Sequence, residues 1–243
     1  NYFDHHAAGE IPAHANLHAH INTEAGVCTS LLMDRHLGGA FRPWALVGAY
    51  GDNLAEVADA LGESAGLPSE DRAQLRMLGE AINYNAYGDD EQDVHIAPAR
   101  LYDIMARYSD PRELLARETI AQQLDELKHA DLKRAAGVAP HWQDKRGSVI
   151  LLPDAPWSRR VIGALANQLA RAQPTRAHAV LKALRGGAYL ASVRAPQVSR
   201  SGANELCRRF GGAGRAAAAG IDRLPENELE DFVREFAAAR WEV

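Results

Sequence analysis

The spacing of apolar residues over the first 110 positions predicts a series of helices. In residues 23–37, apolar side chains recur every three or four positions, and two glycines follow the last of them. The same spacing predicts helices at residues 54–61, 69–84 and 98–108. Residues 44–50 are instead continuously apolar and end at a Gly-Asp-Asn turn, which predicts a buried strand.

The pattern changes after residue 110. Residues 111–136 carry an apolar stripe and predict one long helix, which a Gly-Val-Ala-Pro segment ends. Beyond it the pattern predicts strands at residues 148–152, 177–184 and 188–193 and helices at residues 155–171, 201–210 and 226–240. Such alternation is typical of an α/β domain. We therefore predict an α/β protein with a first domain over residues 1–110, a linker helix over 111–140 and a smaller domain over 141–243.

Length and composition exclude several classes of protein. A chain of 243 residues with 47% hydrophobic residues can fill a core, which argues against a disordered or fibrous protein. No stretch approaches the ~20 continuous apolar residues of a membrane span, and no signal segment opens the chain, so we expect a cytoplasmic protein without a membrane partner. Cys28 and Cys207 form neither a disulfide framework nor a metal-binding Cys pair, which fits a reducing compartment.

Charge is divided unevenly along the chain. The residues up to His141 include 11 basic and 22 acidic side chains, net −11, whereas those from Trp142 onward include 16 and 10, net +6. An acidic half beside an arginine-rich half suits a metal site facing an anion-binding surface. A genome rich in Arg and Ala, or ordinary charged helix surfaces, would give similar counts, so composition leaves these explanations open.

Residues at the start of the chain are candidates for metal binding. Two aromatic residues predict the end of a buried strand, and Asp4, His5 and His6 follow, a set of donors suited to Mn²⁺, Zn²⁺ or Mg²⁺. Asp52 ends the other predicted strand 47 residues after His5, so a helical crossover could bring both to one sheet edge. Asp52 could equally cap the helix that begins near Leu54. We expect three other histidines to lie in a solvated loop: His14, His18 and His20.

A second candidate segment combines arginines with small residues. Residues 208–220 read RRFGGAGRAAAAG. Residues without bulky side chains let backbone N–H groups approach an anion, and guanidinium groups supply paired donors to phosphate. The segment matches neither the Walker pattern nor GxGxxG. Small residues also permit tight packing of a turn on a sheet, and both interpretations stay open.

The order and spacing of these motifs together resemble a known family. An Asp-His-His triplet, an Asp after an apolar segment, a linker helix and a small domain with a Gly-rich run ending Ala-Ala-Gly resemble the DHH phosphoesterases that carry a DHHA1 domain. That family contains RecJ-like exonucleases and oligoribonucleotide or nucleotide phosphatases. The resemblance covers nearly the whole chain. It implies the C-terminal part of a parallel-sheet DHH domain, a linker helix and a smaller α/β DHHA1 domain.

The resemblance also implies roles for individual residues. His5 and Asp52 match metal ligands, and His6 matches the histidine that contacts the scissile phosphate. Asp4 would support the histidines from the strand end. The implied substrate-binding residues of the second domain are Arg194, Gly211, Gly212, Gly214 and Arg215. Ala213 and Arg215 depart from the family's GGGGHxxAAG signature, so a guanidinium would replace an imidazole at the anion.

Two motifs of the family that precede the triplet have no counterpart in the sequence. The resemblance therefore implies roughly 60 to 120 further N-terminal residues, the size of several βα units. It implies two divalent ions, Mn²⁺ or Mg²⁺, in the complete protein, and weak or no activity of the chain as given. The implied substrate is a nucleotide or a short single-stranded oligonucleotide, and a homodimer stays open.

Two other functions remain open from the sequence. The chain could be a nucleotide-binding or nucleic-acid-binding module with a vestigial metal site, for which affinity should fall steeply with salt. It could also hydrolyse pyrophosphate or polyphosphate, which needs no base recognition.

Overall fold

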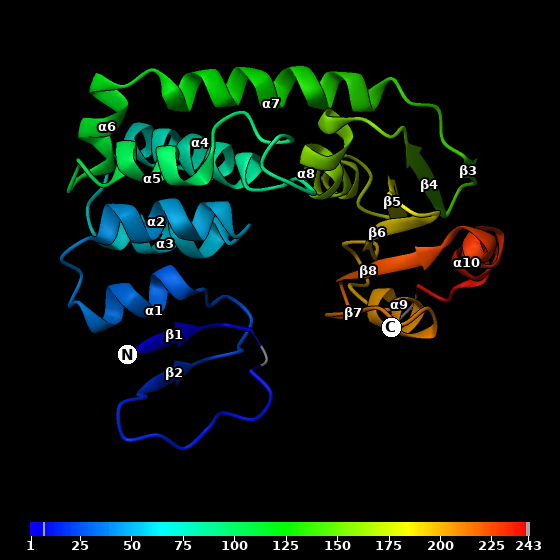
Figure 1. Ribbon diagram of the computed structural model, residues 1–243, viewed down its shortest axis with the longest axis horizontal. Coiled ribbons are helices and arrows are strands. Elements are labelled where there is room, and N and C mark those ends of the chain that lie inside the picture. Colours follow the sequence, from blue (N-terminus) through cyan, green and yellow to red (C-terminus); the bar gives the residue numbers. More distant parts are fainter. Residues whose placement is uncertain (7, 242–243) are drawn as a thin grey trace. The chain divides into compact units, whose positions relative to one another are not determined.

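The computed structural model describes residues 1–6 and 8–241, which divide into two compact units. Unit 1 comprises Asn1–Ala86 and His95–Leu127, and unit 2 comprises Tyr87–Val94 and the residues from Lys128 onward. Both helices and strands are present, so the prediction of an α/β fold is confirmed (Figure 1).

Unit 1 combines a short parallel strand pair with helices. Its elements are β1 (Tyr2–Asp4), β2 (Ala19–Ile21), α1 (Thr29–His36), α2 (Arg42–Gly51), α3 (Ala55–Ser64), α4 (Ser69–Asn85), α5 (Pro98–Met105), α6 (Pro111–Arg117) and the first part of α7 (Ile120–Ala136). Strand β1 lies beside β2, with Phe3 opposite His20 (Figure 1). A buried apolar cluster, which includes Leu31, Leu46 and Leu75, joins α1, α2 and α4. This helical core supports the end of β1.

Helix α2 shows that the prediction of a strand at residues 44–50 is wrong. The helix contains Pro43 in its first turn, where a missing N–H group is tolerated. The run is continuously apolar because much of the helix is buried, and such a run does not distinguish a buried strand from a buried helix. Close packing adds to this burial, since a Cβ added to Gly79 of α4 would lie 2.2 Å from the Val47 carbonyl oxygen.

Other elements of unit 1 also differ from the prediction. Helix α1 begins at Thr29 and not near residue 23, after a turn in which Gly26 has a φ of +87°. The single helix predicted over residues 111–136 is wrong, because Glu118 is extended, with a ψ of 137°, and separates α6 from α7. This break lets α6 pack Leu114 into the core of unit 1.

The first residues form a strand, but a more exposed one than predicted. Tyr2 in β1 is 50% exposed. The loop predicted around His18 and His20 contains β2, and the His20 ring stacks on Phe3 with a centroid distance of 4.5 Å. An exposed three-residue strand with a histidine at its centre lacks the alternating apolar pattern that would reveal it in the sequence.

Unit 2 contains a mixed sheet with helices. Its elements are β3 (Trp142–Gln143), β4 (Gly147–Leu152), α8 (Pro156–Ala172), β5 (Ala177–Leu184), β6 (Ala188–Arg194), α9 (Ala203–Arg209), β7 (Ala213–Gly214), β8 (Ala218–Pro225), a 3₁₀ turn (Glu226–Glu228) and α10 (Leu229–Ala238). The strand order is β3-β4-β5-β6-β8-β7, in which β4 and β5 are parallel and the other neighbours antiparallel. The core strands and α8 lie where the sequence predicts them.

The two faces of this sheet have different character. A Cβ added to Gly147 would meet Phe236 of α10, so this face of β4 is directed at the apolar core that includes Phe232 and Leu181. Neighbouring side chains in a strand point to opposite faces. Ser148 therefore lies on the other face, where its hydroxyl is 2.9 Å from Nδ1 of the buried His178. Helix α8 packs against β5 and β6.

The end of the chain differs from the prediction in two places. The Gly- and Ala-rich run at residues 211–220, for which no strand was predicted, contains β7 and the start of β8. The sequence did not predict β8. The helix predicted over residues 226–240 is wrong at its start, where a 3₁₀ turn precedes α10, and α10 ends at Ala238.

Buried ion pairs link the segment Tyr87–Val94 to the rest of unit 2. Arg159 of α8 contacts Asp93 at 2.9 Å and Asp89 at 3.1 Å, and Lys182 of β5 also pairs with Asp89. Burial opposes ionisation of Asp93, but the Asp89 amide and the Arg159 guanidinium outweigh it and lower the Asp93 pKa. These charges therefore stabilise a position for an acidic segment that apolar packing alone would not fix.

Among the described residues, none of the helices has both the length and the apolar character needed to cross a bilayer.

Candidate metal and phosphate site

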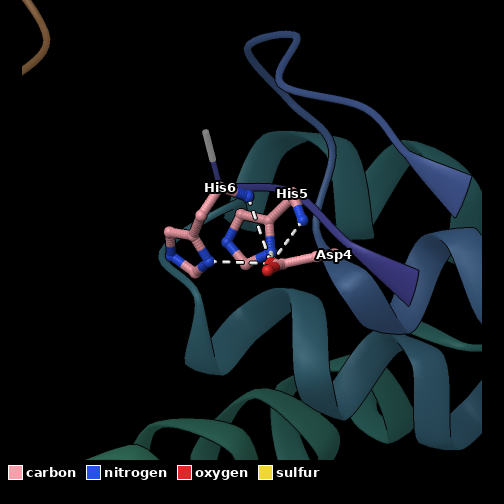
Figure 2. A group of neighbouring side chains, drawn as sticks. All are labelled: Asp4, His5 and His6. Atoms are coloured by element: carbon pink, nitrogen blue, oxygen red, sulfur yellow. Dashed lines mark hydrogen bonds and ion pairs between the residues drawn. The ribbon is translucent and has the colours of Figure 1, made fainter. Parts of the chain in front are cut away.

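Asp4 organises the residues at the end of β1. Its Oδ1 accepts hydrogen bonds from the amides of His5 at 2.7 Å and His6 at 3.1 Å and from His6 Nδ1 at 2.9 Å (Figure 2). Its Oδ2 accepts a bond from the Tyr2 hydroxyl at 3.0 Å. These donors, the His6 side chain foremost, hold the pKa of Asp4 well below its usual range. Asp4 is therefore an ionised group that positions the two histidines.

His5 lies between α1 and the end of α2. Its Nε2 is 3.4 Å from Oδ2 of Asp52, and its side chain is 12% exposed, against 42% for Asp52. Its other ring nitrogen, Nδ1, is 3.0 Å from the Thr29 hydroxyl oxygen. The ring is thus oriented by contacts at both nitrogens.

The setting of Asp52 favours a nearby cation. Asp52 follows the last residue of α2, and its amide donates to the Gly48 carbonyl at 3.0 Å. The C-terminal end of a helix carries a partial negative charge, so a carboxylate there is destabilised and a cation is stabilised. A bound metal ion would supply that positive charge.

His6 is the most exposed residue of the triplet. Its side chain is 74% exposed, and its ring centroid is 4.0 Å from that of His5. Because Nδ1 is directed at Asp4, Nε2 lies on the far side of the ring (Figure 2). This orientation suits a group that donates a proton or a hydrogen bond to a substrate oxygen.

The donor set fits a divalent cation. One ligand atom from each of Asp4, His5 and His6 lies within 4.8 Å of the others. The His5 Nε2 and Asp52 Oδ2 atoms are 3.4 Å apart. Two ligands about 2.1 Å from one ion, at right angles, would be about 3 Å apart, so only a small adjustment is needed. Imidazole nitrogen with carboxylate oxygen suits Mn²⁺ or Zn²⁺, and carboxylate oxygen suits Mg²⁺.

The structure brings together the four residues predicted at this site but by a different route. The sequence pattern predicted His5 and Asp52 at the ends of two parallel strands. In the structure β1 delivers His5, whereas a helix end delivers Asp52. The end of a buried helix and the end of a strand therefore serve the same purpose, which is to place a polar side chain at the edge of an apolar core.

Arg194, predicted to bind substrate, lies in β6 of unit 2. Its Nε donates to Asn167 of α8 at 2.7 Å, and its Nη1 donates to the Ser192 hydroxyl at 3.1 Å. Burial lowers the pKa of Arg194. The guanidinium is thus fixed in orientation, and an anion would relieve part of its desolvation cost.

The Gly-rich run forms a hairpin with little open backbone. Four backbone amides of this segment already donate to main-chain carbonyls. They are the amides of Gly211, Gly212, Arg215 and Ala218. A Cβ added to Gly212 would lie 2.2 Å from the Gly220 carbonyl oxygen, and one added to Gly214 would lie 2.5 Å from Ala219 Cα. Packing of β7 on β8 therefore accounts for these two glycines. Exposed Arg215, in the turn between the strands, stays a candidate anion contact.

Thr29 is a partner of His5 that the sequence pattern did not reveal. The pattern placed Thr29 in a helix interior, because the helix was predicted to begin six residues too early. The useful signal was Gly26, whose positive φ marks the turn before α1. A threonine at a helix start is well placed to contact a neighbouring strand end, whereas one inside a helix is not.

Comparison with known proteins identifies the fold. The chain is similar to a solved structure described as the DHH domain of a member of a family of ribosomal proteins, with 15% identity and a TM-score of 0.55 over 88% of this chain and 54% of that one. It is similar to the pGpG-specific phosphodiesterase PggH from Vibrio cholerae, with 14% identity and a TM-score of 0.52 over 95% of this chain and 82% of that one. RecJ from Thermus thermophilus bound to Mn²⁺ superposes with a TM-score of 0.40, too low to support an argument about this chain.

At the level of sequence, no family model matches the chain and no curated protein does. The chain spans about half the length of the first of these structures. The resemblance to DHH proteins is thus confirmed at the level of the fold.

Proposed function

We propose that the chain is part of a phosphoesterase that uses divalent cations to hydrolyse a nucleotide or a short single-stranded oligonucleotide. One observation carries the proposal: His5 and Asp52, 47 residues apart in sequence, place a nitrogen and an oxygen donor 3.4 Å apart beside His6. The fold supports it, because the PggH structure with which the chain shares that fold is a phosphodiesterase by name.

In the proposed mechanism each residue of unit 1 has a separate task. His5 and Asp52 hold a cation, Mn²⁺ or Mg²⁺, which when bound would activate water and neutralise charge on the phosphoryl group. His6 donates from Nε2 to a phosphoryl oxygen as negative charge develops there. Asp4 holds the His6 ring through Nδ1 and so fixes its orientation.

In unit 2 the proposal assigns anion binding to two arginines. Arg194 is held by Asn167, so its orientation is set before a ligand arrives. Arg215 is exposed and supplies a second guanidinium. We retain Gly211 as a candidate for close backbone approach, since a Cβ added there would meet nothing within 4 Å. Gly212 and Gly214 contribute to anion binding only indirectly, because they allow the close packing of β7 on β8.

A single pair of protein ligands holds a catalytic ion weakly. We therefore propose a second ion, and further ligands for both ions, in the complete protein.

The test compares hydrolysis by the complete wild-type protein and by its His5→Ala variant, with His14→Ala as the control. Substrates are pGpG, a short oligonucleotide and pyrophosphate, each with and without Mn²⁺. We expect Mn²⁺-dependent hydrolysis of the first two, reduced at least about 100-fold by His5→Ala, the scale of losing a metal ligand's contribution. Hydrolysis that is unchanged in His5→Ala would refute the metal assignment.

The same assay separates the other functions. Turnover of pyrophosphate alone would favour a pyrophosphatase, and salt-sensitive binding of oligonucleotide without Mn²⁺-dependent turnover would favour a binding module.

A further inference from the structure

Unit 2 contains a pocket that the proposed function does not use. Its volume is about 190 Å³, and it is lined by residues from the end of α7, from β3 and β4, and from the second half of α8. The walls are mostly apolar, and they include Ala135, Val138, Ile150, Leu165 and Leu169. The residues assigned above to metal or substrate are not among those that line the pocket.

Arg176 gives this pocket a positive charge. Three of its five N–H groups donate to the Gln173 side chain at 2.5 Å and to the Asp144 and Gly147 carbonyls at 2.7 and 2.9 Å, which fixes the guanidinium. Its Nε–H is buried and has no acceptor among residues 1–6 and 8–241. The Asp144 carboxylate pairs instead with Arg146. Among the described residues that line the pocket, none is acidic, so the charge of Arg176 is not balanced there.

The other polar groups of the pocket are neutral. Gln168 and Gln173 line it, and because the Gln173 side-chain oxygen accepts from Arg176, the Gln173 NH₂ group is a donor. Ser148 also lines it, with its hydroxyl 2.9 Å from Nδ1 of the buried His178. Burial, and after it the positive charge of Arg176, lowers the pKa of His178 to about 4, so this ring adds no positive charge at pH 7. The pocket therefore offers one cation and several neutral groups.

We propose that this pocket binds a small organic monocarboxylate. Buried polar groups in proteins usually have partners, and a carboxylate oxygen would accept from the Arg176 Nε–H, which otherwise lacks an acceptor in the described part of the chain. One guanidinium balances the single negative charge of a carboxylate. A cavity of about 150 Å³ in another protein takes up benzene, so a volume of about 190 Å³ suits one ring with a carboxyl group. The apolar walls would cover the ring.

The experiment titrates the 243-residue chain with benzoate, benzamide and phenyl phosphate. Benzamide has nearly the shape of benzoate without its charge, and phenyl phosphate carries a different anion on the same ring. Arg176→Met removes the guanidinium, and Arg171→Met removes an equal charge from an exposed position in the last turn of α8.

A second pair of variants leaves Arg176 in place. Gln168→Trp adds bulk among the lining residues at an exposed position of α8, and Gln122→Trp makes the same change at an exposed position of α7. Circular dichroism confirms that each variant is folded. If Arg176→Met is not folded, Gln168→Trp carries the test.

Proton–nitrogen NMR reports binding through the Arg176 Nε–H signal and the backbone amides of Ser148 and Ile150. We expect saturable binding of benzoate, at least about 10-fold tighter than that of benzamide, which is the scale of a hydrogen bond to a charged group. Phenyl phosphate should bind more weakly than benzoate. Arg176→Met and Gln168→Trp should each weaken benzoate binding at least about 10-fold, whereas Arg171→Met and Gln122→Trp should stay within about threefold of the wild type.

Three results would overturn the proposal. The first is equal affinity for benzoate and benzamide, or no binding of either. The second is an equal loss of affinity in each variant and its control. The third is binding of phenyl phosphate at least as tight as that of benzoate, which would make the site one for phosphate and the assignment to carboxylates wrong. The test needs no metal ion and no hydrolysis, so its outcome is independent of the function proposed for unit 1.

Discussion

The ion pair between Arg160 and Asp131 allows a direct test of what stabilises unit 2. Arg160 of α8 donates from Nη2 and Nε to Asp131 of α7 at 2.8 and 3.0 Å, and the two side chains are only 8% and 4% exposed. Asp131→Asn keeps the shape of the side chain but removes the buried negative charge that Arg160 contacts through two N–H groups. Removing one partner of a buried pair destabilises a protein by about 3–5 kcal/mol. We expect Asp131→Asn to lower the free energy of unfolding by that amount.

The matched control is an exposed pair in the same unit. Arg234 and Asp231 lie in one helix with their groups 2.5 Å apart, but their side chains are 68% and 58% exposed. Exposed pairs contribute about 0.2–1 kcal/mol because water screens the charges. Asp231→Asn should therefore have little effect.

Urea unfolding followed by circular dichroism measures both variants. At a slope of about 2 kcal/mol/M, Asp131→Asn should lower the midpoint by about 1.5–2.5 M and Asp231→Asn by less than about 0.5 M. A third variant, Asp131→Leu with Arg160→Met, replaces the pair by apolar groups and should recover most of the loss. Equal shifts for the two single variants would refute the reasoning, and a double variant as unstable as Asp131→Asn would show that packing, not unpaired charge, is responsible.

Two further predictions concern buried groups. Burial lowers the pKa of His178 from 6.5 to about 4, so as the pH falls the unfolded chain binds a proton before the folded chain does. The contribution of His178 to the free energy of unfolding is therefore complete above pH 6.5 and falls by up to about 3 kcal/mol toward pH 4. Urea midpoints at pH 7 and 5 should differ less in His178→Gln than in the wild type, and an equal difference would exclude His178 as the cause. Gly79→Ala places a Cβ 2.2 Å from the Val47 carbonyl and should destabilise by about 1–3 kcal/mol, whereas Gly163→Ala, in the interior of α8 with nothing within 4 Å, should stabilise by about 0.5–1 kcal/mol. Thermal unfolding compares them, and a loss of stability in both would contradict the packing argument.

The sequence predicted regular elements best where one face is buried and the other exposed. Helices α4 and α8 have strong periodic patterns, and their bounds differ from the predictions by no more than one residue. The pattern failed for α2, which is buried so widely that its apolar residues have no period. It also failed for β8, whose first residues are alanine and glycine and whose longest pairing is with β6, a strand that is distant in sequence.

The candidate site was predictable in its residue types but not in its geometry. The Asp-His-His triplet and Asp52 are visible as polar residues that follow apolar segments. The distance between them depends on α2 being a helix and on how closely α2 packs against α1. At Gly48 of α2 this packing is so close that an added Cβ would lie 2.5 Å from the Ser30 hydroxyl oxygen. A local pattern carries no information on such long-range contacts. This is also why Thr29 was missed.

The two carboxylates of the site have opposite electrostatic settings, and this difference indicates separate roles. Asp4 already receives four hydrogen bonds at the end of β1, which stabilise its charge without any cation. Asp52 stands at the C-terminal end of α2, where the helix opposes a negative charge. A cation therefore gains more from Asp52 than from Asp4. This contrast supports the roles proposed above, in which Asp4 orients the histidines and Asp52 is a metal ligand.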